Sequence, residues 1–420
     1  MKTRYLIFYF TVGFLKPLPT LAGMFSVNYD NIKNVLESRS TRLEAQRLEV
    51  DASKIREGSL TRSFLPKLEF QASQETFKKG TYAQKTQPSY GLEASVNLYN
   101  GGKDQIESDI RELNTQKKSF QYMRVTAEEL LAARVLLSEI LYTQEKITLL
   151  DSVIKINSQN SNSALKRIRS GVATESDKME FEIKAVNLKQ ELELAKLQFK
   201  IQIDELKVLL NLDTTDQIQL PKELAHEHDF ENKLKHTHDD HDVLAKESEL
   251  QAEMGSLVSK SAKRTWWPKL DAVAGLNQFN EREEADYPDS EQRKESYVGL
   301  RISLSIPDGF ESHKESEAQA KESIAYRKLA EFQRKQAHSH VENEVAELNL
   351  LHNQVHDAEE NINRAEKYYK LTQSEYARGV KNSPDMLSAA EKIFEVRNKR
   401  LEILKDFNLK QAHVLSKINK

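Results

Sequence analysis

The residues best suited to chemistry lie in one polar stretch, residues 226–242, which reads HEHDFENKLKHTHDDHD. It holds five of the eleven histidines of the chain: His226, His228, His236, His238 and His241. Neutral imidazoles beside carboxylates bind ions such as Zn²⁺, Cu²⁺ or Ni²⁺. The spacings match no closed metal site, however, and a solvated linker can carry histidine without binding anything. Both interpretations stay open from the residues alone, and no resident cofactor is predicted.

A second pair of histidines, His352 and His356, lies at a spacing of four residues, which puts both on one face of a helix. No motif of catalysis accompanies them. The sequence has no nucleophile elbow, no phosphate-binding loop, no zinc-protease helix and no carboxylate pair in an apolar setting. It also has no cysteine, which excludes disulfides and thiol catalysis. The sequence therefore does not predict an enzyme.

Two short stretches interrupt long helical regions: SGVATESD at residues 170–177 and RGVKNSPD at residues 378–385. Each has a glycine followed six residues later by an aspartate, Gly171 and Asp177 in the first and Gly379 and Asp385 in the second. Glycine readily ends a helix in the left-handed conformation. Thr174 and Asn382 are then expected to be N-caps of the next helices, each in a capping box with the aspartate three residues on. Two helical hairpins are predicted.

The two turns belong to a tandem repeat with an offset of 208 residues. Two pairs of landmarks share this offset, Gly171 with Gly379 and Asn100 of LYNGG with Asp308 of SIPDGF. The motifs FLPKLEF and WWPKLDA instead align Pro66 with Pro268, which are 202 residues apart. The second copy thus holds six more residues (208 − 202), expected in the polar stretch 273–297, because surface loops accept insertions and packed helices do not.

Each copy also contains a segment in which every second residue is apolar, YGLEASVNL (90–98) and VGLRISLSI (298–306). Residues 66–76 and 270–276 are expected to be their partner strands, with a polar loop near 77–88. Such alternation over about ten residues is typical of a transmembrane β-strand, although a half-buried strand of a soluble sheet shows it too. Four strands scattered through a helical chain are, however, too few for a good soluble core.

The other segments carry helical signals. From Phe181 to Leu209 the apolar residues recur at steps of four and three, which is the heptad seam of coiled-coil packing. Residues 28–62 are expected to form a helix before the first strand. Residues 103–168, as one helix, would extend about 100 Å at 1.5 Å per residue. The sequence predicts a mainly helical chain in which two long coiled-coil hairpins accompany four β-strands.

Residues 1–22 have the layout of a secretory signal peptide, with basic Lys2 and Arg4, an apolar run, and small residues at Thr20 and Ala22. A buried strand or helix is the alternative. No other stretch approaches the about 18 apolar residues of a membrane-spanning helix. The net charge of −3, without a basic patch interleaved with aromatics, gives no sign of nucleic-acid binding. An exported protein is expected.

Together these motifs resemble the TolC-like outer membrane efflux proteins, the outer membrane factor family. The resemblance rests on FLPKLEF before a strand, LYNGG before a long helix, and RIRSGVATESDKME and YARGVKNSPDML at the hairpin turns. It implies a homotrimer whose twelve pooled strands form a β-barrel in outer-membrane lipid above a periplasmic α-helical barrel. Strand counting alone requires only that chains pool their strands, since about eight are needed for a small barrel, so a dimer or a tetramer also fits.

The resemblance further implies a passive duct without catalysis in a tripartite efflux or type I secretion system. Its partners would be a periplasmic adaptor and an inner-membrane pump of the RND or ABC type. Adaptor docking is implied at the helical tips: Gly171, Val172, Asp177, Gly379, Val380 and Asp385. The periplasmic constriction is implied at Tyr376, Lys381 and Asp385. Ser388 replaces a second acidic residue of well-known members, so an acidic ring is expected to be weaker here.

Three aromatic residues, Phe64, Trp266 and Trp267, precede the two strand prolines. Aromatic side chains favour membrane–water interfaces. An anchoring belt is one interpretation, and ordinary packing of a helix-to-strand corner is the other.

The predicted organisation has four segments: a signal peptide (1–22), a first repeat (23–212), a His/acid-rich linker (213–242) and a second repeat (243–420). The alternative function is an exported coiled-coil scaffold without a pore, which explains the helices but not the strands. A narrower alternative is the outer membrane component of a heavy-metal efflux system that uses the His-rich linker.

Overall fold

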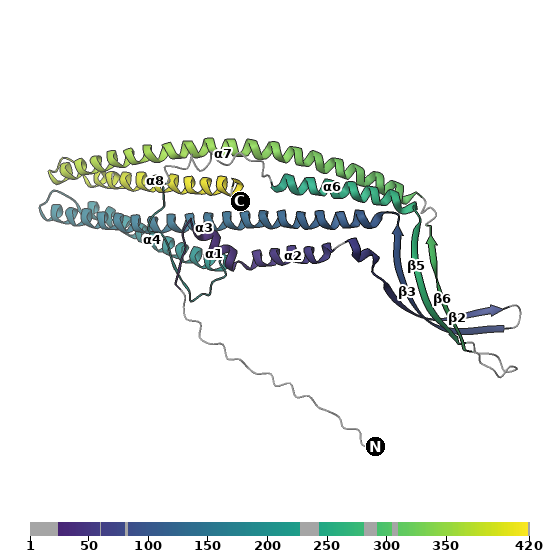
Figure 1. Ribbon diagram of the computed structural model, residues 1–420. Coiled ribbons are helices and arrows are strands. Elements are labelled where there is room, and N and C mark those ends of the chain that lie inside the picture. Colours follow the sequence, from purple (N-terminus) through teal and green to yellow (C-terminus); the bar gives the residue numbers. More distant parts are fainter. Residues whose placement is uncertain are drawn as a thin grey trace, which may run out of the picture. The chain divides into compact units, whose positions relative to one another are not determined.

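The computed structural model describes residues 24–58, 60–79, 83–226, 243–280, 292–304 and 310–418. Its long helices are α3 (Lys103–Arg169), α4 (Glu175–Leu209), α7 (Glu311–Ala377) and α8 (Ser383–Ile418). The shorter helices are α1 (Ile32–Arg39), α2 (Thr41–Glu57) and α6 (Val243–Lys263), with 3-10 turns η1 (Leu60–Phe64) and η2 (Arg264–Trp266). The strands are β1 (Met24–Ser26), β2 (Lys67–Lys79), β3 (Ala83–Asn100), β4 (Gln217–Gln219), β5 (Lys269–Asn280) and β6 (Gln292–Ser303) (Figure 1).

The bounds of the helices confirm the tandem repeat. Helices α3 and α7 each have 67 residues, and their first residues are 208 apart (311 − 103). Helix α8 likewise begins 208 residues after α4 (383 − 175). Strands β2 and β5 begin only 202 residues apart (269 − 67). The six extra residues of the second copy therefore lie between the start of β5 and the start of α7, the region that contains the predicted stretch 273–297.

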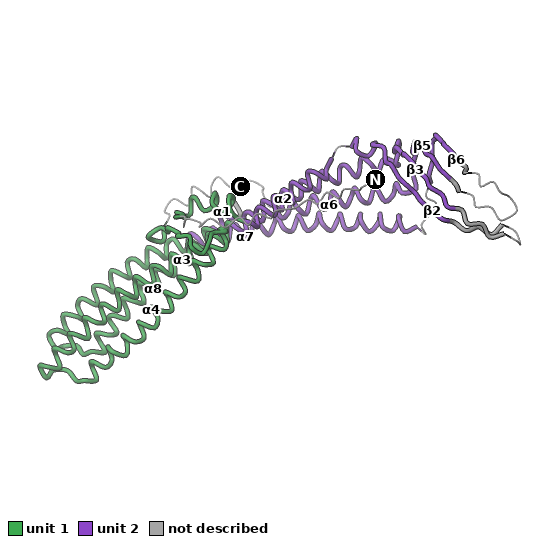
Figure 2. The backbone as a smooth tube through the Cα atoms, turned by 90° about the horizontal axis from the view of Figure 1, so that it is seen from below, with its two compact units in different colours: residues 1–40, 130–227, 350–412 green, residues 41–129, 228–349, 413–420 purple. Residues whose placement is uncertain are grey.

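The chain forms two compact units, each built from parts of both copies (Figure 2). The first unit comprises residues 1–40, 130–227 and 350–412, and the second comprises residues 41–129, 228–349 and 413–420. Helices α3 and α7 each contribute one part to the first unit and another part to the second. The predicted segment bounds follow the sequence repeat and remain a prediction.

Helix packing in the first unit follows the predicted heptad seam of α4. The buried apolar residues of this helix are Phe181, Leu188, Leu192, Ala195 and Leu206. The middle three pack against α3 and α8 in one cluster, which also contains Leu149, Leu150, Val153 and Leu401. Gln202 is buried at the position where the apolar pattern skips a step. The unit also contains a short parallel pair, β1 with β4, which the sequence did not predict.

The second unit contains a four-stranded antiparallel sheet in the order β2-β3-β5-β6. Its register aligns Phe70, Leu92 and Leu276 across three strands, so that the alternating apolar residues share one face. The large side chains of this face are between 47% and 89% exposed: Leu68, Phe70, Leu92, Leu276, Val298, Leu300 and Ile302. A contiguous apolar surface of this kind marks a contact with lipid or with another protein.

Three of the predicted element bounds are wrong. The expected loop near 77–88 is mostly strand, because backbone pairing of β2 with β3 continues through the polar residues to Lys79 and Ala83. The helix expected over 28–62 begins at Ile32, is interrupted at Ser40, whose ψ is 118°, and resumes as α2 up to Glu57. Strand β6 ends at Ser303 rather than at residue 306.

Two predictions fall outside the described residues, namely the signal peptide at 1–22 and the landmark Asp308. In the described part of the chain, none of the helices combines the length and the apolar character needed to cross a membrane.

Candidate functional site

Both hairpin tips turn on a glycine in the left-handed conformation, with φ of +75° at Gly171 and +83° at Gly379. The Gly171 N–H donates to the carbonyl of Ile168, and the Val172 N–H donates to the carbonyl of Arg167, both at 2.9 Å. This pair of bonds is a Schellman motif, which satisfies carbonyls at the end of α3. The same two bonds recur at the second tip, 208 residues on.

The helices that leave the tips start with the predicted caps. The Asp177 carboxylate accepts hydrogen bonds from the Thr174 N–H at 2.7 Å and from the Thr174 hydroxyl at 2.9 Å. At the second tip, Asn382 and Asp385 exchange reciprocal N–H to side-chain bonds of 3.2 and 3.0 Å. The predicted capping is confirmed. Chiefly through the backbone N–H of Thr174, the pKa of Asp177 is lowered from its usual value.

The residues after each glycine are exposed and apolar. Val172 is 58% exposed and Val380 is 70% exposed. No other described atom lies within 4 Å of the position that a Cβ would take at Gly171 or Gly379. Each tip thus presents bare backbone and one valine side chain, a surface onto which another helix can pack closely. Adaptor docking at these residues remains a prediction.

An arginine that the sequence reasoning missed joins the two tips. Arg167 of α3 donates from Nη1 to the carbonyls of Tyr376 at 3.0 Å and of Lys381 at 3.1 Å. Its guanidinium carbon also lies 4.1 Å from the centre of the Tyr376 ring. A departure from the repeat was the available signal, because the position 208 residues after Arg167 holds Glu375. Arg167 ties the turn of the second hairpin to the first.

The three residues predicted for the constriction lie close together but play different parts. Lys381 Nζ lies 3.8 Å from the Asp385 carboxylate. The Tyr376 side chain is buried in a core cluster with Phe181 of α4. Its hydroxyl lies 3.1 Å from the Ser383 hydroxyl at the start of α8. Tyr376 therefore anchors the tip within the protomer, and the constriction itself remains a prediction.

The predicted interface aromatics lie where helices meet the sheet. Phe64 ends η1, and Trp266 and Trp267 precede β5, all three partly exposed. The Trp266 indole N–H donates to the Ser312 hydroxyl at 2.8 Å. A Cβ at Gly101 would lie 2.9 Å from the Trp267 Cβ. These contacts are those of a packed helix-to-strand corner, and the membrane belt stays a prediction.

The polar face of the sheet holds a charged cluster that sequence reasoning also missed. Glu93 of β3 accepts two hydrogen bonds from Arg301 of β6, at 2.7 and 2.6 Å, and one from the Tyr297 hydroxyl at 2.5 Å. The intervening residue on β5 is Gly275, where a Cβ would lie 2.4 Å from the Tyr297 ring. Only the strand register reveals this cluster. The sheet therefore has an ionic face and an apolar face, as a wall between water and lipid requires.

Of the predicted metal ligands, the structure describes His226, whose Nε2 lies 3.0 Å from Nδ1 of His352. The other four histidines of the linker, His228, His236, His238 and His241, lie outside the described residues. Within the described ranges, no three His, Cys, Asp or Glu side chains already have their ligand atoms arranged as a metal site.

Comparison with known proteins identifies the family and the fold. The model of the family described as outer membrane efflux protein matches residues 238–413. The CmeC outer membrane channel of Campylobacter jejuni is similar with a TM-score of 0.76 at 12% identity, over 93% of this chain and 85% of that one. The open state of the MtrE outer membrane channel of Neisseria gonorrhoeae gives 0.73 at 14% identity, over 93% and 88%.

The outer membrane protein VceC of Vibrio cholerae gives a TM-score of 0.73 at 14% identity, over 92% of this chain and 96% of that one. No curated protein matches the chain in sequence. At these identities the solved structures establish the fold, a helical barrel with a β-barrel, and the family model establishes the kind of protein. Residues 238–413 thus belong to the outer membrane efflux protein family, and the chain has the fold of outer-membrane channels, which confirms the predicted TolC-like outer membrane factor and its outer-membrane location.

Proposed function

We propose that the protein is the passive exit duct of a tripartite export system, a homotrimer joined by a periplasmic adaptor to an inner-membrane pump of the RND or ABC type. The family supports an efflux duct. The observation that carries the proposal is the sheet of the second unit, which has exposed leucine, valine and isoleucine on one face and the Glu93–Arg301 pair on the other. Such a sheet is stable between lipid and a water-filled lumen.

The edges of the sheet support pooling of strands between chains. In the described sheet, β2 and β6 each pair with one neighbour only. Open strand edges are not tolerated in lipid, where every backbone N–H and C=O needs a partner. Three chains with four strands each close a barrel of twelve strands, well above the about eight of the smallest barrels. In this arrangement β2 of one protomer pairs with β6 of the next.

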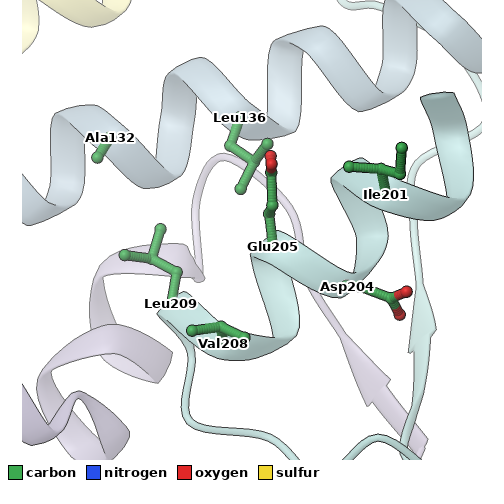
Figure 3. Close-up of a pocket in the computed structure, with 7 residues that line it drawn as sticks. All are labelled: Ala132, Leu136, Ile201, Asp204, Glu205, Val208 and Leu209. Atoms are coloured by element: carbon green, nitrogen blue, oxygen red, sulfur yellow. The ribbon is translucent and has the colours of Figure 1, made fainter.

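The surface of the first unit supports the same assembly. A groove lies between α3 and α4, lined by Ala132, Leu136, Ile201, Asp204, Glu205, Val208 and Leu209 (Figure 3). Further along α4, apolar side chains are exposed: Met179, Ile183, Val186, Leu194 and Leu197. These residues are not on the buried seam of the helix. A neighbouring protomer that packs against α4 would remove them from water.

A test of adaptor coupling uses the absence of cysteine from the chain. Val172→Cys and Val380→Cys each introduce a single thiol at an exposed tip, and Glu193→Cys introduces one on the exposed surface of α4 as a control. We expect a thiol-reactive crosslinker in intact cells to join the tip variants, and not the control, to a periplasmic protein that copurifies with an inner-membrane pump. Capture at the control position alone contradicts docking at the tips.

Cell fractionation separates the duct from the scaffold without a pore. The duct predicts a heat-resistant trimer in detergent-solubilised outer membrane. A soluble, elongated monomer or dimer in the periplasmic fraction contradicts it.

A further inference from the structure

Three histidines gather where the linker segment meets α7. The ring centre of His226 lies 4.8 Å from that of His352 and 5.6 Å from that of His356. The two α7 rings are 5.1 Å apart. All three residues belong to the first unit. Two of them come from one face of a helix and the third from a segment 126 residues away in sequence.

These separations are those of three imidazoles around one tetrahedral ion. With Zn–N bonds of about 2.0–2.1 Å, each ring centre lies roughly 3.2 Å from the ion, and ring centres at tetrahedral angles lie about 5 Å apart. The facing nitrogens of His226 and His352 are 3.0 Å apart. Two nitrogens on one such ion are about 3.3 Å apart, so a few tenths of an ångström, with rotation of the rings, complete the arrangement.

The backbone that carries His226 is held in place by two other helices. The Leu224 N–H donates to the Glu145 carboxylate of α3 at 2.6 Å. The Asn408 amide of α8 donates to the Ala225 carbonyl at 3.0 Å. The Phe407 ring meets the His226 ring edge-on, with centres 5.3 Å apart. The third imidazole is therefore positioned before any ion binds, which lowers the entropic cost of binding.

The surroundings of the cluster suit a cation. The Glu359 carboxylate lies 4.0 Å from Nδ1 of His356 and accepts hydrogen bonds from Arg400 at 3.2 and 2.8 Å. The Arg400 guanidinium is the main cause that lowers the pKa of Glu359, so this carboxylate is ionised at neutral pH. A carboxylate beside a ligating histidine orients the ring and raises its basicity. His356 is 53% exposed and leaves a path from solvent.

We propose that His226, His352 and His356 form a binding site for one divalent cation that prefers nitrogen ligands, with Zn²⁺ as the best match. Water completes the coordination. The bound ion is a resident component of the duct and not its cargo, so the site is independent of what the protein exports. An ion bound here fixes the start of the 226–242 segment to α7.

The test measures Zn²⁺ binding to the purified full-length protein in detergent after treatment with a chelator. Equilibrium dialysis with metal analysis is expected to give one Zn²⁺ per chain. His352→Asn/His356→Asn is expected to weaken binding by more than about 100-fold, since loss of a residue that only orients a ligand already costs 10- to 100-fold. His338→Asn/His340→Asn, on the exposed surface of the same helix, is the matched control and retains binding.

A second variant distinguishes the cluster from the rest of the linker. Replacement of His228, His236, His238 and His241 by asparagine leaves the three proposed ligands intact and is expected to retain the site. Loss of Zn²⁺ in this variant, with binding unchanged in His352→Asn/His356→Asn, overturns the proposal, as does a wild-type protein that binds no Zn²⁺. His356→Asn alone, at an exposed position, guards against misfolding and is expected to weaken binding while the thermal transition of the metal-free protein stays the same.

Discussion

Gly275 tests whether the sheet is built around the contact between Glu93 and Tyr297. The register places Glu93 opposite Gly275 and Gly275 opposite Tyr297, so the tyrosine must reach across β5. A Cβ at Gly275 would lie 2.4 Å from Cζ of Tyr297 and 2.5 Å from its hydroxyl oxygen. Gly275→Ala therefore forces the ring to move by about 1 Å to regain an ordinary contact.

The cost of this movement follows from overpacking. An extra methyl group against a packed side chain typically costs about 1–3 kcal/mol through displaced rotamers. Gly299→Ala is the matched control, because Gly299 lies two residues from Tyr297 on β6 and has no atom within 4 Å of the added Cβ. A change without contacts is usually within about 0.5 kcal/mol. We expect Gly275→Ala to destabilise the protein by about 2 kcal/mol relative to Gly299→Ala.

The assay is unfolding of the purified protein by urea in detergent, followed by tryptophan fluorescence. Both tryptophans of the chain, Trp266 and Trp267, precede β5 and report on this sheet. A double-mutant cycle completes the test, because in a Tyr297→Ala background the added methyl has no ring to displace and its cost should vanish. Equal stability of Gly275→Ala and Gly299→Ala, or an unchanged cost in the Tyr297→Ala background, would refute this reasoning.

Three further predictions concern the hairpin tips. Asp177→Ala removes the acceptor at the cap of α4 and costs about 1 kcal/mol, so amide exchange in the first turn should speed up about fivefold. Because the folded pKa of Asp177 is lowered, its contribution is full above the unfolded value of about 3.9 and is lost as pH falls through the folded value, so wild-type protection should approach that of Asp177→Ala in acid, and a pH-independent difference contradicts this. Arg167→Leu removes the donor to the Tyr376 carbonyl and should raise the channel conductance in planar bilayers, whereas unchanged conductance means that this link does not restrain the tip. Phe181→Ala empties a fully buried position at a cost of about 3–5 kcal/mol and should lower the thermal transition, while an unchanged transition contradicts the packing.

Local chemistry explains what was predictable from the sequence. A left-handed glycine followed by a capping residue defines each tip within eight residues, and the repeat of the pattern located both hairpins. The face of each strand was also predictable, because alternation has a period of two. The length of β2 and β3 was not, since backbone pairing continues through polar residues up to Lys79 and Ala83.

The missed residues depend on contacts between distant segments. Arg167 matters only because α3 and α7 end side by side, and nothing near it in sequence shows which carbonyls it reaches. Glu93 and Tyr297 are joined through the register of three strands. The metal interpretation was assigned to the linker alone, whereas the structure brings its first histidine to His352 and His356, which the helical spacing had already paired.

The most direct test of a membrane-embedded, water-filled duct is the accessibility of single cysteines along β6. Alternate residues of this strand point to opposite faces. In protein reconstituted into lipid vesicles, Gly299→Cys and Ser303→Cys should react with a membrane-impermeant thiol reagent, and Val298→Cys, Leu300→Cys and Ile302→Cys should be protected by lipid. Reactivity that alternates with a period of two supports the account, and equal reaction at all five positions contradicts it.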